Sequence, residues 1–174
     1  IIIAAPAVNR VGEAKAQQIH PDQVVVDSPF VHDPVLAYEN GKYYLYSTGH
    51  GISQMTSADR KHWTLCREGV LKNHEIPAWT HDSVPGFHTH IWAPDVIHYR
   101  NKWYLAYSCS TFGKNTSAIG LLSNTSLANM NGWKDEGCIL ASEGKRDNWN
   151  AIDPNFVIDD KGNPWMTWGS FWDG

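Results

Sequence analysis

The stretch "HDPVLAYENGKYYLYST" at residues 32–48 carries the pattern that decides the fold. Apolar and polar residues alternate on both sides of Glu39-Asn40-Gly41. Alternation around an Asn-Gly turn is typical of a β-hairpin, because successive side chains of a strand point to opposite faces of the sheet. The stretch therefore predicts two short antiparallel strands that begin just after an Asp-Pro pair.

The same pattern occurs twice more, as "APDVIHYRNKWYLAYSCS" at residues 93–110 and "IDPNFVIDDKGNPWMTWGS" at residues 152–170. The intervening segments also resemble each other: "ISQMTSADRKHWTLCREGVL" (52–71) and "IGLLSNTSLANMNGWKDEGCIL" (119–140) each contain an apolar run, a Ser-containing turn and a Trp. Units of roughly four short strands, repeated about every 60 residues, are typical of the blades of a β-propeller. A β-sandwich is the alternative, but the repeat favours an all-β propeller.

The segment before the repeats, residues 1–27, is expected to be separate from the partial propeller domain at residues 28–174. Its start, "IIIAAPAV", resembles the end of a signal peptide with a small-residue cleavage motif at Ala5-Pro6-Ala7. Residues derived from a vector are the alternative. Residues 11–19 are expected to form a short helix, followed by a lead-in strand.

Composition excludes several classes of protein. The net charge is −4 and no basic run occurs, so nothing favours nucleic acid or an anionic membrane as a partner. Nine Trp and seven Tyr residues are expected mostly in the core, while some could stack on sugar rings. The three cysteines, an odd number without metal-like spacing, predict neither a disulfide framework nor a metal site.

An aspartate lies near the start of each repeated hairpin, at Asp33, Asp95 and Asp153. In a propeller these three carboxylates are expected to converge at one end of the central channel. An Asp before Pro often only stabilises a turn, but here the flanking residues are aromatic. Carboxylates grouped beside Trp and His suit glycoside hydrolysis, in which one activates water and another protonates the leaving oxygen.

The motifs "VHDPVL", "HIWAPDV", "YSCSTFG", "NAIDPNF" and "WGSFWDG", in this order and spacing, resemble glycoside hydrolase family 43. Within that family they are most similar to the arabinan endo-1,5-α-L-arabinosidases, or arabinanases, and the resemblance covers residues from about 28 to 174. It implies a five-bladed propeller, of which this chain supplies about two and a half blades. It also implies an inverting hydrolase of α-1,5-linked L-arabinan from plant cell walls, secreted or periplasmic in a bacterium.

The resemblance also implies roles for individual residues. Asp33 matches the general base, and Asp153 matches the acid that orients the proton donor and tunes its pKa. Asp95 is expected to be structural or to contact substrate. Trp92 and Phe112 match positions that stack arabinose rings. Further residues expected to line the pocket are His32, Gly113, Asn150, Ala151, Ile152, Ser170, Phe171 and Trp172.

The third acid of the family, a Glu that protonates the leaving sugar, belongs to a later blade, and the context of Glu143 does not match it. We therefore expect a truncated or half-propeller form with little activity alone. It could be a fragment, associate with the missing C-terminal half, or form a homodimer that completes a five-bladed ring. The rival functions are a non-catalytic arabinan-binding module and a β-xylosidase or α-L-arabinofuranosidase of the same family.

Metal binding has weak support in the sequence. His88 and His90 would place two imidazoles on one face of a strand, but no third ligand follows at a useful spacing, so zinc is not predicted. No cofactor is expected to be required. The resemblance implies calcium or another ion in the central channel, with key surroundings in a later blade.

Overall fold

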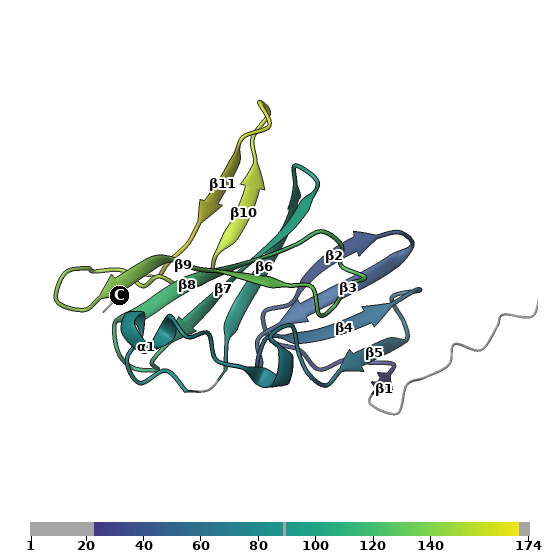
Figure 1. The fold of residues 1–174 in the computed structure, drawn as a ribbon, viewed down its shortest axis with the longest axis horizontal. Coiled ribbons are helices and arrows are strands. Elements are labelled where there is room, and N and C mark those ends of the chain that lie inside the picture. Colours follow the sequence, from purple (N-terminus) through teal and green to yellow (C-terminus); the bar gives the residue numbers. More distant parts are fainter. Residues whose placement is uncertain (1–22, 89, 171–174) are drawn as a thin grey trace, which may run out of the picture.

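The computed structural model describes residues 23–88 and 90–170, which form eleven strands and two single helical turns. The strands form three antiparallel sheets that follow one another in chain order (Figure 1). The prediction of an all-β fold is confirmed. The helix expected at residues 11–19 lies outside the described residues.

The first sheet has the strand order β1-β5-β4-β3-β2. In the β2–β3 hairpin, Val35 pairs with Tyr46 and Glu39 pairs with Lys42, as expected for residues 32–48. β1 adds a fifth strand against β5, one more than the four predicted for each repeat. The bounds are β1 Gln23–Val26, β2 Val35–Glu39, β3 Lys42–Ser47, β4 Ser53–Ser57 and β5 Trp63–Cys66.

The second and third sheets repeat the hairpin. The second has the order β6-β7-β8-β9, and the third consists of β10 and β11 alone. Both predicted hairpins, at residues 93–110 and 152–170, are present as β6–β7 and β10–β11. The bounds are β6 Trp92–Tyr99, β7 Lys102–Ser110, β8 Thr116–Asn124, β9 Lys134–Glu143, β10 Asn155–Ile158 and β11 Pro164–Thr167.

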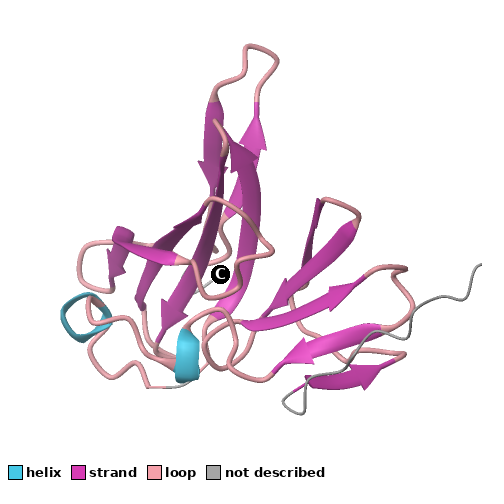
Figure 2. Cartoon of the chain, turned by 45° about the vertical axis from the view of Figure 1, so that its right-hand side comes forward, coloured by secondary structure: helices cyan, strands magenta, loops and turns pink. Residues whose placement is uncertain are grey.

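The connection between the first two sheets contains the helical turns, the 3₁₀ turn η1 (Lys72–His74) and α1 (Thr80–Ser83) (Figure 2). The sequence did not predict them, since neither is long enough to show a helical period. No helix within the described residues is long and apolar enough to cross a membrane.

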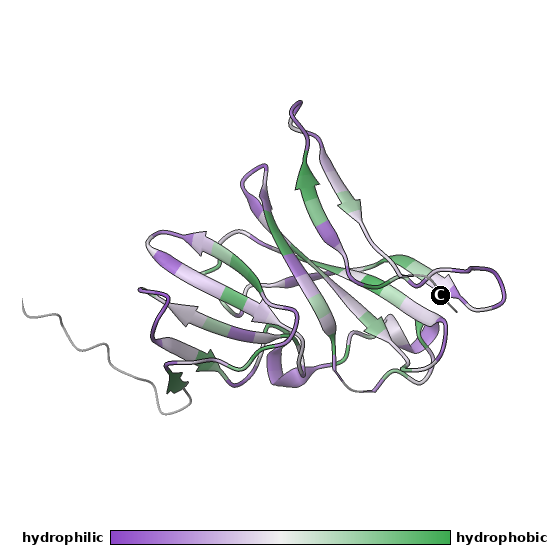
Figure 3. Cartoon of the chain, turned by 180° about the vertical axis from the view of Figure 1, so that it is seen from behind, coloured by the Kyte–Doolittle hydropathy of each residue, from purple (hydrophilic) through white to green (hydrophobic). Residues whose placement is uncertain are grey.

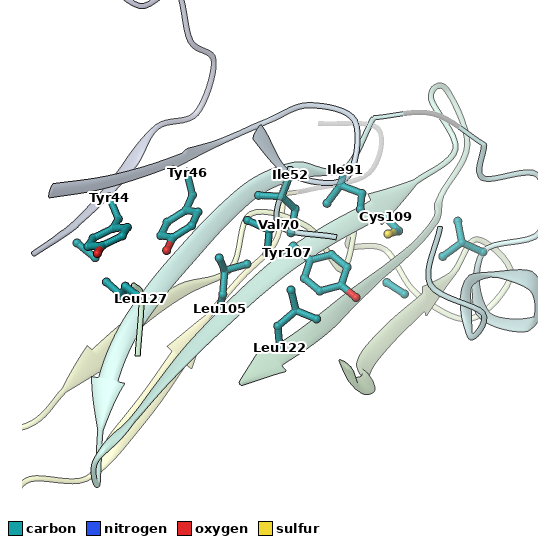
Figure 4. Close-up of a cluster of buried hydrophobic side chains, with 13 residues drawn as sticks. Tyr44, Tyr46, Ile52, Val70, Ile91, Leu105, Tyr107, Cys109, Leu122 and Leu127 are labelled. Carbon is teal, nitrogen blue, oxygen red and sulfur yellow. The ribbon is translucent and has the colours of Figure 1, made fainter. Parts of the chain in front are cut away.

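The main core lies between the first and second sheets (Figure 4). Tyr46 from β3 packs there with Leu105, Tyr107 and Leu122 from β7 and β8, and all four are fully buried. Burial of a large apolar side chain stabilises a fold by about 1.5–3 kcal/mol. Hydrophobic residues run along the strands, whereas the hairpin tips are hydrophilic (Figure 3). The alternation of apolar and polar residues along the strands therefore reflects the packing of one sheet against the next.

A smaller core joins the second sheet to the third. Ala106, Ile119 and Ala151 are fully buried there, and Trp149 and Phe156 pack against them. Consecutive sheets thus bury their facing sides, as propeller blades do. The described residues form three sheets rather than a closed ring, so closure into five blades stays a prediction.

The three cysteines, Cys66, Cys109 and Cys138, are all free, in agreement with the expectation of no disulfide framework. Cys109 is fully buried in the main core. Burial raises the pKa of its thiol, so Cys109 acts as an apolar core residue.

Candidate active site

The backbone at the start of each repeated hairpin has the same unusual conformation. The residue that precedes proline has a positive φ of 50° at Asp33, 40° at Ala93 and 53° at Asp153, at positions spaced by 60 residues. Left-handed backbone is unfavourable for residues with a Cβ, by roughly 1–2 kcal/mol. Strain of this kind persists where the surrounding structure imposes it and is concentrated at functional sites.

This repeat corrects the predicted alignment of Asp95 with Asp33 and Asp153. Ala93 occupies the equivalent position, and Asp95 lies two residues later inside β6. Its Oδ2 accepts hydrogen bonds from the backbone N–H of Phe156 and from Asn155 Nδ2. Burial raises the pKa of Asp95 and outweighs these hydrogen bonds, which lower it. Asp95 therefore joins β6 to β10, a structural role.

A hydroxyl near the end of the second strand of each of the first two hairpins, β2–β3 and β6–β7, binds the start of the next hairpin. Thr48 Oγ1 accepts a hydrogen bond from Ala93 N–H at 2.9 Å, and Ser108 Oγ accepts one from Asp153 N–H at 2.9 Å. Thr48 Oγ1 also donates to Asp33 Oδ2 at 2.7 Å. Sequence analysis missed both hydroxyls, although their spacing of 60 residues was a usable signal.

The charge of Asp33 acts on the second candidate catalytic carboxylate, Asp153. Burial raises the pKa of Asp153, and the negative charge of Asp33 raises it further. Contacts also connect the two groups: Thr48 bonds both Asp33 and Ala93, and Ser108, the strand partner of Trp92, accepts the N–H of Asp153. The fold therefore brings both aspartates into one region. His32 Nδ1 lies 2.8 Å from Asp33 Oδ2, so His32 contacts the predicted base directly.

The two predicted sugar-stacking residues lie together. The rings of Trp92 and Phe112 meet edge to face, with centroids 6.4 Å apart. Trp92 pairs with Ser108, and Phe112 lies beside Gly113 in the turn between β7 and β8, where its side chain is 90% exposed. An exposed aromatic side chain beside a second one offers a surface for a flat ligand.

A second aromatic pair lines a cavity of about 360 Å³ next to the third sheet. Trp149 and Trp168 meet with ring centroids 6.0 Å apart, and Gly169 and Ser170 complete the lining. The backbone N–H of Asn150 donates to Ser170 O at 3.0 Å, which fixes this wall to the segment before Asp153.

The other predicted pocket residues differ in their exposure. Ile152 is half-buried and its carbonyl accepts a hydrogen bond from Gly169 N–H at 2.7 Å. Ala151 is fully buried and donates its N–H to Ser142 Oγ, so the structure gives it a packing role. Phe171 and Trp172 lie outside the described residues.

His88 and His90 precede β6 instead of sharing a strand face. His88 Nδ1 lies 2.6 Å from Gly86 O, and His90 Nε2 lies 3.1 Å from His50 Nε2. Among the described residues, no three His, Cys, Asp or Glu side chains are grouped so that they could hold a metal ion. The channel ion implied by the resemblance has no ligand set in this part of the chain, and no step proposed below uses it.

The profile of the glycosyl hydrolases family 43 matches residues 23–174. The chain belongs to this family. The match includes every described candidate residue of the site, from His32 to Ser170, and so supports the carboxylates and aromatics as parts of one glycosidase scaffold.

Two family 43 relatives are named as enzymes of arabinan. The extracellular exo-α-(1→5)-L-arabinofuranosidase ArbA of Cellvibrio japonicus is 44% identical over 83% of this chain and 42% of its own length. The extracellular endo-α-(1→5)-L-arabinanase 1 of Bacillus subtilis is 41% identical over 83% of this chain and 44% of its own length. The chain therefore spans less than half the length of these relatives.

Two solved structures of arabinanases are also similar to this chain. An exo-1,5-α-L-arabinanase from a bovine ruminal metagenomic library has a TM-score of 0.77 and 52% identity over 84% of this chain and 48% of that chain. The Cellvibrio cellulosa α-L-arabinanase complexed with arabinohexaose has a TM-score of 0.74 and 43% identity over 83% of this chain and 46% of that chain. The fold of these arabinanases is thus shared over more than four fifths of this chain.

Proposed function

We propose that the chain forms the general-base side of a glycosidase active site for α-1,5-linked L-arabinan. The observation that carries this proposal is that two aspartates at strained strand entries, Asp33 and Asp153, are linked through Thr48 and Ser108 to the strand that carries Trp92, the partner of Phe112. The names of the relatives, an arabinofuranosidase and an arabinanase, support arabinan as the substrate class.

In this proposal Asp33 activates a water molecule for attack on the anomeric carbon. Thr48 and His32 both contact Asp33 Oδ2, and we propose that Oδ1 faces the water. An inverting glycosidase needs a base and a proton donor separated by about 6.5–9.5 Å, so that water fits between base and sugar. The proton donor is expected to be a Glu from a later blade.

Asp153 supports that proton donor in the proposed mechanism. Its pKa is raised by burial and by the charge of Asp33. A carboxylate beside a second carboxylic acid makes ionisation of that acid less favourable. Asp153 would therefore keep the donor protonated until it transfers its proton to the leaving oxygen.

A non-catalytic arabinan-binding module is the second candidate, favoured by the exposed Phe112 beside Trp92. The two functions separate in one experiment with linear arabinan and arabinohexaose. Asp33→Asn should remove release of new reducing ends and retain oligosaccharide binding, whereas the exposed control Asp82→Asn should change neither. Because the proposed proton donor belongs to a later blade, the decisive assay supplies that Glu together with this chain. Binding without turnover in that assay would favour the binding module, and an active Asp33→Asn variant would exclude Asp33 as the base.

We also infer that further strands cover the third sheet. Within residues 23–88 and 90–170, β10 and β11 pair only with each other, and Val157, Ile158 and Trp165 are 49%, 42% and 59% exposed. Exposed apolar residues on a two-stranded sheet favour association, with either a second copy or the C-terminal half of a propeller. Light scattering that shows a stable monomer at micromolar concentration would exclude the homodimer.

We also propose that the protein is secreted, because both relatives named above are extracellular enzymes.

A further inference from the structure

The hydroxyl of Thr48 connects two sheets at the proposed active site. It lies 2.7 Å from Asp33 Oδ2, at the entry of the first sheet, and 2.9 Å from the backbone nitrogen of Ala93, at the entry of the second. An amide N–H can only donate, and a hydroxyl has one proton to give. The proton of Thr48 must therefore point at the Asp33 carboxylate while its oxygen accepts from Ala93.

The backbone holds Thr48 in place on both sides. Its own N–H donates to His32 O at 3.0 Å, next to Asp33. The following residue, Gly49, exchanges two hydrogen bonds with Ile91 at 3.0 and 2.9 Å, two residues before Ala93. Thr48 is β-branched, which further limits its side-chain rotamers. The hydroxyl is therefore a fixed donor rather than a mobile one.

The equivalent positions of the other sheets do not provide this contact. Ser108 accepts the N–H of Asp153, the same backbone bond that Thr48 receives from Ala93. In the third sheet the equivalent residue is Gly169, which bonds Ile152 O through its N–H as Thr48 bonds His32 O, and glycine has no hydroxyl. Among the bonds described for these three equivalent positions, only the hydroxyl of Thr48 donates to a carboxylate.

We propose that Thr48 is a positioning residue, which fixes the carboxylate of Asp33 relative to the sugar-stacking side of the second sheet. This inference rests on the proposed function, in which Asp33 is the base. Thr48 bonds Asp33 Oδ2 and is itself bonded to Ala93 of the second sheet. The orientation of the carboxylate is then fixed relative to that sheet, so that Oδ1 points toward the proposed water and toward the sugar ring that stacks near Trp92. Small errors in the placement of reacting groups can reduce a rate by about 100-fold.

Three substitutions in this chain test the inference. Thr48→Val keeps the shape and removes the hydroxyl, Thr48→Ser restores a hydroxyl on a smaller side chain, and Thr64→Val makes the same chemical change on β5 of the same sheet, away from Asp33. Thermal unfolding first checks that each variant folds. NMR then reports the rotamer of Asp33 from its Hα–Hβ couplings, with its signals assigned by Asp33→Asn, and the amide shift of Ala93.

We expect a single Asp33 rotamer in the unaltered chain, in Thr48→Ser and in Thr64→Val, and averaged couplings with a displaced Ala93 amide in Thr48→Val. Turnover of linear arabinan by Thr48→Val should fall roughly 10–100-fold in kcat with KM changed less than about twofold, and Thr48→Ser should recover most of the rate. If the chain shows no turnover, the Hα–Hβ couplings of Asp33 alone decide whether Thr48 orients its side chain.

The outcomes separate the two claims. A fixed Asp33 rotamer in Thr48→Val, or an unchanged kcat when Asp33→Asn is inactive, overturns the role of Thr48 and leaves the proposed function standing. An active Asp33→Asn variant overturns the proposed function itself, together with any catalytic purpose for the contact, even where the couplings show that Thr48 orients the side chain. If Thr48→Val does not fold, the couplings in Thr48→Ser decide, because averaging there contradicts the inference.

Discussion

Thr48 and Ser108 lie 60 residues apart and accept the same hydrogen bond, one from Ala93 N–H and the other from Asp153 N–H, both at 2.9 Å. Each bond fixes the strained residue that opens the following sheet. At Ala93 and Asp153, the left-handed backbone conformation thus occurs together with a hydrogen bond that holds the residue in place. At two of the three positions with this conformation, the residue is a candidate catalytic aspartate, Asp33 or Asp153. Ala93 has the same backbone conformation without a carboxylate.

That difference makes Ala93→Gly a test of the strain. Glycine removes the left-handed penalty of about 1–2 kcal/mol and adds about 0.5–1 kcal/mol of backbone entropy. We expect a net stabilisation of about 0.5–1 kcal/mol in urea unfolding. The control Ala37→Gly, at a buried position in β2, should lose stability by about 0.5–1 kcal/mol or more. A less stable Ala93→Gly variant would contradict the strain argument.

The acid–base coupling at the site predicts a pH-dependent effect of Asp153→Asn. The folded chain holds the Asp153 proton more tightly than the unfolded chain, because burial and the charge of Asp33 raise its pKa above 3.8. The stabilising contribution of this group is therefore complete below pH 3.8 and is lost as the pH rises through the raised pKa. Asp153→Asn should be more stable than the unaltered chain at pH 7 and equal to it in acid.

Solvent screens this carboxylate, so the difference is expected to be small and needs paired denaturation curves at both pH values. Asp82→Asn, in which an exposed carboxylate on α1 is removed, serves as the control for lost charge alone. A destabilised Asp153→Asn at pH 7 would show that the carboxylate is structurally required and would remove the electrostatic explanation.

The hairpins could be predicted because their signals are local. Alternation and turn residues such as Asn40-Gly41 lie within a few positions of the strands they specify. The alignment of Asp95 failed because Asp95 follows its proline, whereas Asp33 and Asp153 precede theirs, and β6 begins three residues earlier relative to its proline than β2 and β10 do. A register irregularity between Trp92 and Asp95 absorbs the difference. Matching aspartates by eye cannot detect such a shift.

Contacts between sheets were also beyond the sequence. The partners of Thr48 and Ser108 lie 45 residues farther along the chain, and only the folded arrangement brings them together. The resemblance identified Trp92 and Phe112, and the structure adds that their rings touch. The candidate residues for the chemistry were thus accessible through motifs, whereas the contacts that hold them required the fold.

Glu39 predicts a second pH effect, of opposite sign, far from the site. Its carboxylate at the end of β2 accepts hydrogen bonds from Trp103 Nε1 at 2.7 Å, Ser126 Oγ at 2.8 Å and Leu127 N–H at 2.8 Å, and so joins the first two sheets. Burial opposes ionisation, but the hydrogen bonds outweigh it and lower the pKa of Glu39 below 4.5. This contribution to stability is present above pH 4.5 and is lost as the pH falls through the lowered pKa.

Glu39→Gln should therefore destabilise the chain by about 1–3 kcal/mol at pH 7, since an amide nitrogen would face donors. The loss should shrink as the pH falls below 4.5, because the unaltered chain then loses the same interactions. Glu68→Gln, an exposed residue after β5, is the control and should have little effect. Equal stability of Glu39→Gln and Glu68→Gln at pH 7 would contradict the role of this link.

Gly120 predicts a steric effect inside the main core. A Cβ at this position in β8 would lie 2.5 Å from Trp79 Cζ2 and 2.5 Å from Tyr107 Cζ. Overpacking of this kind costs typically about 1–3 kcal/mol, so Gly120→Ala should lower the midpoint of urea unfolding. Gly144→Ala, whose added Cβ would lie 3.3 Å from Asn115, should cost less. A neutral Gly120→Ala would show that the Trp79 ring can move aside.

Phe112 predicts a separation of binding from stability. Its ring is 90% exposed and contacts Trp92, so the core loses little when it is removed. Phe112→Ala should unfold at the same temperature as the unaltered chain but bind arabinohexaose more weakly, by about 0.5–1.5 kcal/mol for one aromatic contact, or roughly 2–10-fold in Kd. Tyr38→Ala, at the distant tip of β2, removes an exposed ring without changing Kd. If the two variants bind equally well, the Trp92–Phe112 pair is not the sugar platform, and the stacking surface must be sought at Trp149 and Trp168.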